Sequence, residues 1–446
     1  MEPLLGNRRG TSKPMSVLTK QQRIAKLAKQ SPRMGFTSLN HYLDEEWMRE
    51  AFKSTRKKSS PGLDGVSVEE YGRNLEDNIA DLLERAKSGR YFAPPVKRKR
   101  IPKGNGTETR PIGMPTTEDK VLQRAVTMVL EPIYEQDFLE CSKGFRPGRS
   151  AHQALKELWG QIMGMGGGWV LDVDLEDFYN TLVHTHLREL IRQRVRDGVI
   201  LRLIGKWLKA GVLEGSRVRY PKEGTPQGGV ISPLLSNIYL HYVLDLWFER
   251  EVRPSLRGQA RMIRYADDFV MIFKNKREAL RVKEMMNKRL AHYGLKVHPA
   301  KTRVVRFIPE GDGRPRSGTF NFLGFTHYWG KSRKGRWMVK RKTAKDRLAR
   351  SIRAIRQWCK DNRHKGLRVQ RAALSRKVRG HYGYYGITGN YSQLKRYYEQ
   401  VKRSWRYWLN RRQRGGDMPW SRFNLILEHF PLPQPRVVHS IYAAKP

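Results

Sequence analysis

The sequence predicts an α+β fold, because strand-like and helix-like patterns occupy different parts of the chain. Residues 262–273 hold two runs of β-branched, apolar and aromatic side chains around a Tyr-Ala-Asp-Asp tip, which predicts a β-hairpin. Residues 169–174 form an apolar run that ends in acidic side chains, which predicts a buried strand. Beyond residue 330, apolar side chains recur at helical spacing among many Lys and Arg, so we expect a basic helical bundle there.

The composition indicates a nucleic-acid partner. The 446 residues, enough for two or three domains, include 88 Lys and Arg against 42 Asp and Glu, a formal net charge of +46. A folded protein of this charge repels itself unless it meets a polyanion, and nucleic-acid phosphates release counterions when Lys and Arg neutralise them. A hydrophobic content of 39% argues against a disordered basic tail. A membrane surface is the second candidate, but the sequence has no long uninterrupted apolar run.

The cysteines and the N-terminus bear on the compartment. Cys141 and Cys359 are isolated in the sequence, so no CxxC pair forms a zinc ribbon and a reducing compartment is expected. The N-terminus has no apolar core after its Arg pair, so no secretory signal is predicted. We therefore expect the bacterial cytoplasm or nucleoid.

Before the bundle, the sequence predicts a basic extension, two short strands and a glycine-rich loop. Residues 1–35 are basic with little periodicity, which predicts an extension that orders on a partner. Residues 96–103 and 110–113 predict two short strands joined by a Gly-Asn-Gly turn at 104–106. The Gly-rich residues 163–168 predict a flexible loop that leads into the strand at 169–174.

The C-terminal bundle is predicted from two apolar stripes. The first helix is expected to begin after Thr343 as its N-cap. A shorter helix is expected around residues 369–374. The stripes consist of Leu348, Ile352, Ile355 and Cys359 and, further on, Leu394, Tyr398, Val401, Trp405 and Trp408.

Clustered carboxylates mark a candidate metal site. Asp267 and Asp268 are adjacent at the hairpin tip, where mutual repulsion disfavours ionising both and a divalent cation would relieve it. Oxygen ligands of this kind suit Mg²⁺. Asp172 and Asp174 share one face of their strand, and either could join the hairpin tip if the two elements are neighbours in one sheet. The alternative is a solvated hairpin turn and a solvated strand end.

Seven short motifs decide between these readings. They resemble, in order, successive blocks of the group II intron-encoded reverse transcriptases, also called maturases. They are Arg-Pro-Ile-Gly-Met-Pro at 110–115, Gly-Phe-Arg-Pro-Gly-Arg-Ser at 144–150, Asp-Leu-Glu-Asp-Phe-Tyr at 174–179, Gly-Thr-Pro-Gln-Gly-Gly at 224–229, Tyr-Ala-Asp-Asp at 265–268, Gly-Leu-Lys-Val at 294–297 and Phe-Leu-Gly-Phe at 322–325.

The resemblance implies a right-hand polymerase, with reverse transcriptase fingers and palm at 36–330 and a helical thumb, or maturase domain, at 331–446. It implies that Asp174, Asp267 and Asp268 are the catalytic metal ligands, with Asp172 outside the ligand set. Two Mg²⁺ ions held there would activate a primer 3′-hydroxyl and stabilise the leaving pyrophosphate.

Further side chains are assigned by the same resemblance. The nucleotide pocket is implied to contain Lys103 and Arg110 on the triphosphate, Tyr179 as the wall that selects deoxynucleotides, and Gln227. Template or other nucleic-acid contacts are expected from Arg149, Lys301, Arg341 and Lys342.

The function that the resemblance implies is RNA-directed DNA synthesis of the group II intron type. The partners would be a template or intron RNA, a DNA primer or target and deoxynucleoside triphosphates, and a homodimer is left open. Asn180 and Val183 depart from the usual motif, which puts the immediate subfamily in doubt, and no Cys-paired endonuclease module precedes Pro446, so second-strand cleavage is not expected. Two alternatives remain: a splicing factor that mainly binds RNA, and an intron-free enzyme of DNA repair or phage defence.

Overall fold

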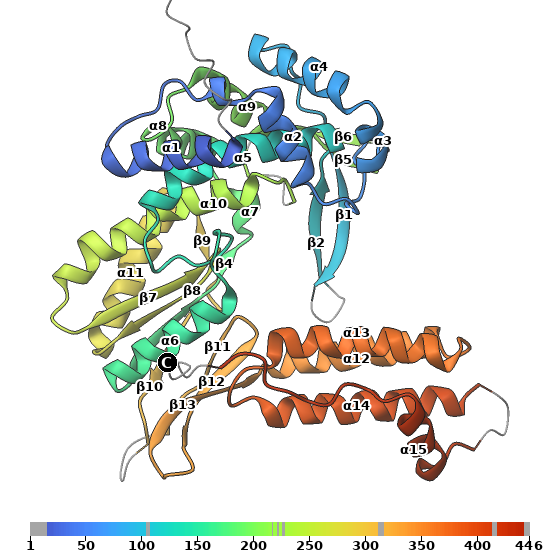
Figure 1. Ribbon diagram of the computed structural model, residues 1–446. Helices are drawn as coiled ribbons and strands as arrows, with labels where there is room; N and C mark the ends of the chain where they lie inside the picture. The colour runs from blue at the N-terminus through green and yellow to red at the C-terminus, as the bar shows by residue number, and fades with distance from the viewer. Residues whose placement is uncertain are drawn as a thin grey trace, which may run out of the picture. The chain divides into compact units, whose positions relative to one another are not determined.

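The computed structural model describes residues 16–103, 108–215, 217–220, 223–224, 228–310, 316–412 and 417–440. The described residues form helices together with mostly antiparallel sheets, and the last four elements are all helices, so the fold is α+β as predicted (Figure 1). The chain forms two compact units. The first lies within residues 1–100, 111–140 and 177–244, and the second within 101–110, 141–176 and 245–446.

The first unit is mainly helical, with a sheet of order β2-β1-β5-β6. The two strands predicted around residues 96–113 are confirmed as β1 and β2, while their joining turn lies outside the described residues. The bounds are α1 Val17–Gln30, η1 Asn40–Tyr42, α2 Glu45–Lys53, α3 Val68–Arg73, α4 Leu75–Ser88, β1 Val96–Lys103, β2 Glu108–Met114, α5 Thr117–Asp137, α7 Phe178–Thr181, α8 His184–Arg192, α9 Gly198–Leu208, β5 Val212–Glu214, β6 Arg217–Arg219, α10 Ser232–Leu240 and η2 His241–Asp245.

The basic N-terminal segment differs from its prediction. Within residues 1–35, α1 is formed and buries Ile24 and Ala28, which are one helical turn apart. The Nζ atom of Lys20 lies 2.6 Å from Oδ2 of Asp44 just before α2. A short helix with an i, i+4 apolar pair is stabilised when that pair packs against other elements of the fold. Here α1 packs against α5 and α2 of the same chain, so its order does not require a partner molecule.

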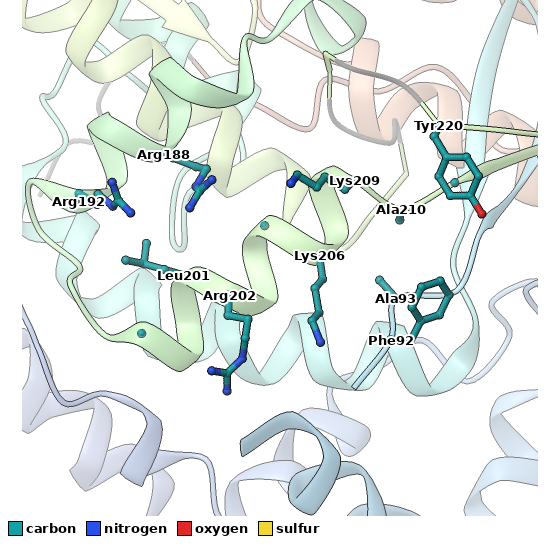
Figure 2. A pocket seen from close by; sticks show the side chains of 13 residues that line it. Phe92, Ala93, Arg188, Arg192, Leu201, Arg202, Lys206, Lys209, Ala210 and Tyr220 are labelled. Carbon is teal, nitrogen blue, oxygen red and sulfur yellow. The ribbon is translucent and has the colours of Figure 1, made fainter. Parts of the chain in front are cut away.

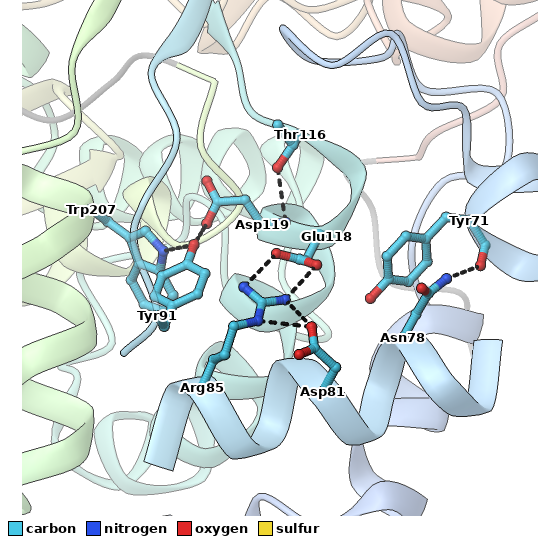
Figure 3. A network of polar contacts seen from close by, with 9 residues as sticks. All are labelled: Tyr71, Asn78, Asp81, Arg85, Tyr91, Thr116, Glu118, Asp119 and Trp207. Carbon is cyan, nitrogen blue, oxygen red and sulfur yellow. Dashed lines mark hydrogen bonds and ion pairs between the residues drawn. The ribbon is translucent and has the colours of Figure 1, made fainter. Parts of the chain in front are cut away.

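A buried hydrogen-bond network joins α5, α9 and the segment after α4 (Figure 3). The hydroxyl of Tyr91 donates to Oδ1 of Asp119 at 2.7 Å, and the indole N–H of Trp207 donates to the Tyr91 oxygen at 3.2 Å. Gln123 donates to the second carboxylate oxygen at 3.1 Å. Burial raises the pKa of Asp119 from 3.8 to about 6, although these hydrogen bonds oppose the rise.

The second unit is built on an antiparallel sheet of order β10-β3-β8-β7. Helix α6 packs on the face that carries Val170 and Ile272, and α11 also lies against β3 and β8. The bounds are α6 Ala151–Met165, β3 Gly168–Val173, β4 Leu175–Glu176, η3 Phe248–Val252, η4 Arg253–Ser255, β7 Ala260–Tyr265, β8 Asp268–Phe273, α11 Lys276–His292, β9 Lys296–Val297 and β10 Arg303–Phe307.

The glycines before β3 end a helix, which corrects the predicted flexible loop. Helix α6 continues to Met165, and Gly166 caps it in the left-handed conformation with φ 67°. The N–H of Gly167 donates to the carbonyl of Ile162 at 3.0 Å. Positive φ favours glycine, so the run of glycines terminates α6 and turns the chain directly into the strand.

A second sheet continues past residue 330, where the domain boundary is predicted, because β12 contains this residue and pairs with β13 that follows it. The apolar stripes of the bundle are confirmed, since their residues are buried or partly buried in one cluster. The N-cap position that was expected for Thr343 is taken by Ala344. Thr343 is instead the last residue of β13, and its hydroxyl accepts a hydrogen bond from the side-chain amide of Asn390. The expected short helix is part of α13. The bounds are β11 Phe320–Phe322, β12 Phe325–Lys331, β13 Trp337–Thr343, α12 Lys345–Asp361, α13 Leu367–Tyr385, α14 Tyr391–Asn410 and α15 Trp420–His429.

None of the helices in the described part of the chain combines the length and the apolar character that a membrane crossing requires.

Replacing Asp119 with Asn is expected to change how stability depends on pH. Because the folded-state pKa of Asp119 is raised to about 6, its contribution to stability is present below pH 4 and is lost as the pH rises past 6. The free energy of unfolding of the wild type should therefore fall, relative to Asp119→Asn, by up to about 3 kcal/mol between pH 4 and pH 7. Urea unfolding of both proteins at several pH values measures this difference, and parallel pH curves would contradict it.

Candidate active site

The acidic tip is a tight hairpin between β7 and β8. Tyr265 pairs with Asp268, so the turn contains only Ala266 and Asp267. Ala266 has φ 59°, in the left-handed region that a non-glycine residue adopts at an energetic cost. The predicted hairpin is confirmed, and its turn conformation requires support from its surroundings.

Arg264 supplies that support from inside the fold. Its side chain is fully buried and pairs with the fully buried Asp245, with the two closest atoms 2.5 Å apart. It also donates to the carbonyl oxygen of Ala266 at 3.0 Å and to the hydroxyl of Ser142 at 2.8 Å. Burial lowers the pKa of the guanidinium, but Asp245 raises it above its ordinary value, so Arg264 is charged.

A glycine of the Gly-Phe-Arg-Pro-Gly-Arg-Ser motif lies directly against the turn. A Cβ atom on Gly144 would stand 2.3 Å from the backbone nitrogen of Ala266, so only glycine fits here. The backbone of the preceding residues also bridges to β7, because the N–H of Arg264 donates to the carbonyl of Cys141 at 2.7 Å and the N–H of Lys143 donates to that of Arg264 at 2.9 Å. This motif therefore braces the hairpin through its backbone.

The sheet register brings the second acidic segment to the hairpin. Asp172 faces Val270 and Val173 faces Phe269, so Asp174 follows the end of β3 beside Asp268, the first residue of β8. Neighbouring strands lie about 5 Å apart, which sets the scale of this approach. The sequence left open whether these segments are neighbours in one sheet, and the structure shows that they are.

The carboxylates of this cluster destabilise each other's charged forms. Burial, together with the charges of Asp172, Asp267 and Asp174, raises the pKa of Asp268 to about 7. Burial likewise raises the pKa of Asp172 to about 6 and that of Asp267 above its ordinary value. The exposed Arg110 of β2 opposes the rise at Asp267.

Asp268, Asp172 and Asp174 each also contact a hydrogen-bond or ion-pair partner. The N–H of Leu323, in the turn between β11 and β12, donates to Asp268, and the N–H of Asn321 in β11 donates to Asp172. Lys301 Nζ lies 3.3 Å from Oδ2 of Asp174. The Phe-Leu-Gly-Phe motif and the segment after β9 thus reach the same acidic cluster.

A hard divalent cation fits the donor chemistry of this cluster. Asp174, Asp267 and Asp268 offer only oxygen donors, and a cation would reduce the repulsion that raises the pKa values of the two hairpin aspartates. Within the described residues, no three His, Cys, Asp or Glu side chains already stand as a complete metal-holding group.

Three further residues that the sequence predicted for the site, Tyr179, Arg149 and Lys342, are described by the structure. Tyr179 is half-buried in α7 of the first unit, with its ring at the edge of Phe178. Arg149 is half-exposed before α6, and Lys342 is exposed with Nζ 5.2 Å from the ring centre of Tyr328. The Lys103 side chain and all of Gln227 lie outside the described residues.

Arg341 was expected on nucleic acid, and its burial corrects this expectation. The side chain is 1% exposed and donates to the carbonyl of Leu155 at 3.3 Å. In β13 the side chains alternate between faces, so Arg341 points into the core while Lys342 points outward. The sequence missed Arg264, Asp245 and Gly144 as site residues. For Arg264, a charged residue within an apolar strand was the available signal.

Comparisons with known proteins identify the family of this chain. A profile described as "Reverse transcriptase (RNA-dependent DNA polymerase)" matches residues 101–327. Protein YkfC of Escherichia coli is 34% identical over 292 residues, 58% of this chain and 76% of YkfC. Group II intron-encoded protein LtrA of Lactococcus lactis is 36% identical over 237 residues, 52% of this chain and 39% of LtrA. Nuclear intron maturase 4 of Arabidopsis thaliana is 28% identical over 216 residues, 48% of this chain and 25% of that protein.

Removing Arg264 is expected to destabilise the second unit strongly. Arg264→Met leaves the charge of Asp245 buried without its partner, which should lower the free energy of unfolding by about 3–5 kcal/mol. Arg264→Met combined with Asp245→Leu should recover most of this loss, because no lone charge remains. Arg261→Met on the same strand is the matched control, since Arg261 is half-buried and has no acidic partner among the described residues. Denaturant unfolding compares the four proteins, and equal loss in the single and double variants would contradict the role of the charge.

Proposed function

Because the chain belongs to the reverse transcriptase (RNA-dependent DNA polymerase) family and is of the group II intron-encoded type, we propose that it extends a DNA primer on an RNA template with Asp174, Asp267 and Asp268 as ligands of two Mg²⁺ ions. The observation that carries this proposal is the register of β3 and β8, which sets Asp174 beside the braced hairpin tip. Two segments nearly a hundred residues apart in sequence thereby share one acidic cluster.

The residues of the chain hold the ligands in place. Arg264 fixes the carbonyl of Ala266, and so the direction in which Asp267 leaves the turn. The N–H of Leu323 holds one oxygen of Asp268. When bound, the two ions would supply the charge that activates the primer hydroxyl and stabilises the leaving pyrophosphate. Lys301 would then exchange its contact with Asp174 for phosphate oxygens of the same site.

The incoming deoxynucleotide is proposed to meet residues from several motifs. Arg110 is exposed, and its positive charge already acts on Asp267, which supports a place near the triphosphate. Tyr179 is proposed as the wall beneath the sugar. Lys103 and Gln227 keep the roles that the family resemblance implies.

We assign the sheet of the second unit to the palm and the basic helices to the thumb. The thumb begins in this proposal at Lys345, because β13 pairs with β12 and belongs to the preceding sheet. Helices α12 to α14 bury one apolar cluster and leave cations such as Arg347, Arg356 and Lys360 exposed, which supports contact with RNA phosphates. Assistance to splicing of an intron RNA and copying of that RNA from a target-site primer are the tasks proposed for this enzyme.

Replacing Asp267 with Asn is expected to abolish DNA synthesis without unfolding the chain. The change removes one ligand charge, while the amide relieves repulsion within the buried cluster. Primer extension on an RNA template with Mg²⁺ should fall by at least about a thousandfold. Asp77→Asn, an exposed aspartate on α4, is the control and should keep full synthesis. Unchanged synthesis by Asp267→Asn would overturn the assignment, and thermal melting of both variants verifies folding.

Tyr179→Ala is expected to relax sugar selection. A planar ring beneath the sugar would clash with a ribose 2′-hydroxyl, so its removal should raise ribonucleotide incorporation by about tenfold to a hundredfold relative to deoxynucleotides. Tyr179→Phe keeps the ring and should keep the selection. Single-nucleotide incorporation with each sugar measures the ratio, and equal ratios in wild type and Tyr179→Ala would remove the role.

A further inference from the structure

The first unit contains a pocket of about 590 Å³ between α8, α9 and the segment before β1 (Figure 2). The floor is formed by α9, where Gly198 and Gly205 lie two turns apart. A Cβ atom on either glycine would meet nothing within 4 Å, so the helix backbone is open to the pocket. The volume lies within the range of about 300–1,000 Å³ in which proteins hold small ligands. The pocket can therefore accept one or two monomer units of a polymer.

The charge of the pocket is of one sign. Five cationic side chains line it and no acidic one does. Two of them are fixed by backbone carbonyls: Arg202 donates to that of Lys87 at 3.0 Å and Lys206 to that of Gly89 at 2.6 Å. The other three are Arg188 and Arg192, one turn apart on α8, and Lys209, and among the described residues none of these three has an acidic partner. Their charges are available to an anion.

Two exposed aromatic rings lie together at one end of the pocket (Figure 2). Phe92 is 68% exposed and Tyr220 is 66% exposed. Phe92 follows Tyr91 of the buried Asp119 network, and the Tyr220 ring lies 3.0 Å from where a Cβ atom on Gly211 would stand. Exposed rings gain free energy when a flat partner stacks on them.

We propose that this pocket binds an unpaired stretch of RNA, with phosphates on Arg188, Arg192 and Lys209 and a base stacked on Phe92 or Tyr220. The inference rests on the proposed function in that RNA is the template and the intron partner of this enzyme. Single strands expose the faces of their bases to aromatic side chains, whereas a duplex keeps them stacked. A site made of cations at one end and bare rings at the other therefore selects an unpaired strand over a duplex.

The test fills the pocket from its floor. Gly205→Leu places a side chain into open space on α9 and replaces a poor helix former, so the fold should persist. Gly160→Leu on α6 is the matched control, because a Cβ atom there also meets nothing within 4 Å and the site lies in the second unit. The full-length protein is irradiated with a 12-nucleotide RNA of 5-iodouridine at moderate salt, and the cross-linked peptides are identified.

We expect cross-links on the peptides that contain Phe92 and Tyr220 in the wild type and in Gly160→Leu. Gly205→Leu should reduce them about tenfold, the size of one lost stacking contact. Primer extension on a short template should be unchanged by Gly205→Leu, so a failure of this proposal is distinguishable from a failure of the polymerase assignment. The proposal is overturned if these peptides are not labelled, if Gly205→Leu labels like the wild type, or if a 5-iododeoxyuridine DNA of equal length labels them equally well.

Discussion

The acidic tip depends on the buried ion pair between Arg264 and Asp245. Burying two charges is expensive, and the pair persists because the guanidinium also reaches the Ala266 carbonyl and the Ser142 hydroxyl. An uncompensated charge at either position would be worse than none. The pair therefore ties the helical segment before η3 to the turn that presents Asp267, and the hydrogen bond from the guanidinium to the Ala266 carbonyl supports the left-handed conformation of Ala266.

The same principle governs the carboxylates around the tip. In a chain with a net charge of +46, the few acids that cluster here are crowded enough to raise one another's pKa values. Backbone N–H groups of the β11–β12 turn and the Lys301 side chain offset part of this repulsion. The negative charge that remains at this site attracts small cations locally, while the positively charged surface around it attracts a polyanion.

The first unit also buries a carboxylate, and there the hydrogen-bond donors are uncharged side chains. Tyr91 and Gln123 donate hydrogen bonds to the buried Asp119, and Trp207 donates to the Tyr91 oxygen. Arg202 and Lys206 of α9 donate to the carbonyls of Lys87 and Gly89 at the end of α4. These contacts fix the backbone next to Phe92, one of the residues that line the α8–α9 pocket. Rigid support beneath an exposed ring is what makes stacking favourable, because less conformational entropy is lost on binding.

The sequence by itself determined the hairpin, the strand at 169–174, the apolar stripes of the bundle and the acidic residues, because period and composition are local properties. The helix end at Gly166, the docking of α1 and the single long α13 were missed, since flanking contacts decide how a short local pattern is used. Only the tertiary structure decided that Arg341 is inside and Lys342 outside, that Gly144 lies on the turn, and that Arg264 carries a buried charge. Each of these depends on the register and burial of strands from distant segments, and no local window of sequence encodes that geometry.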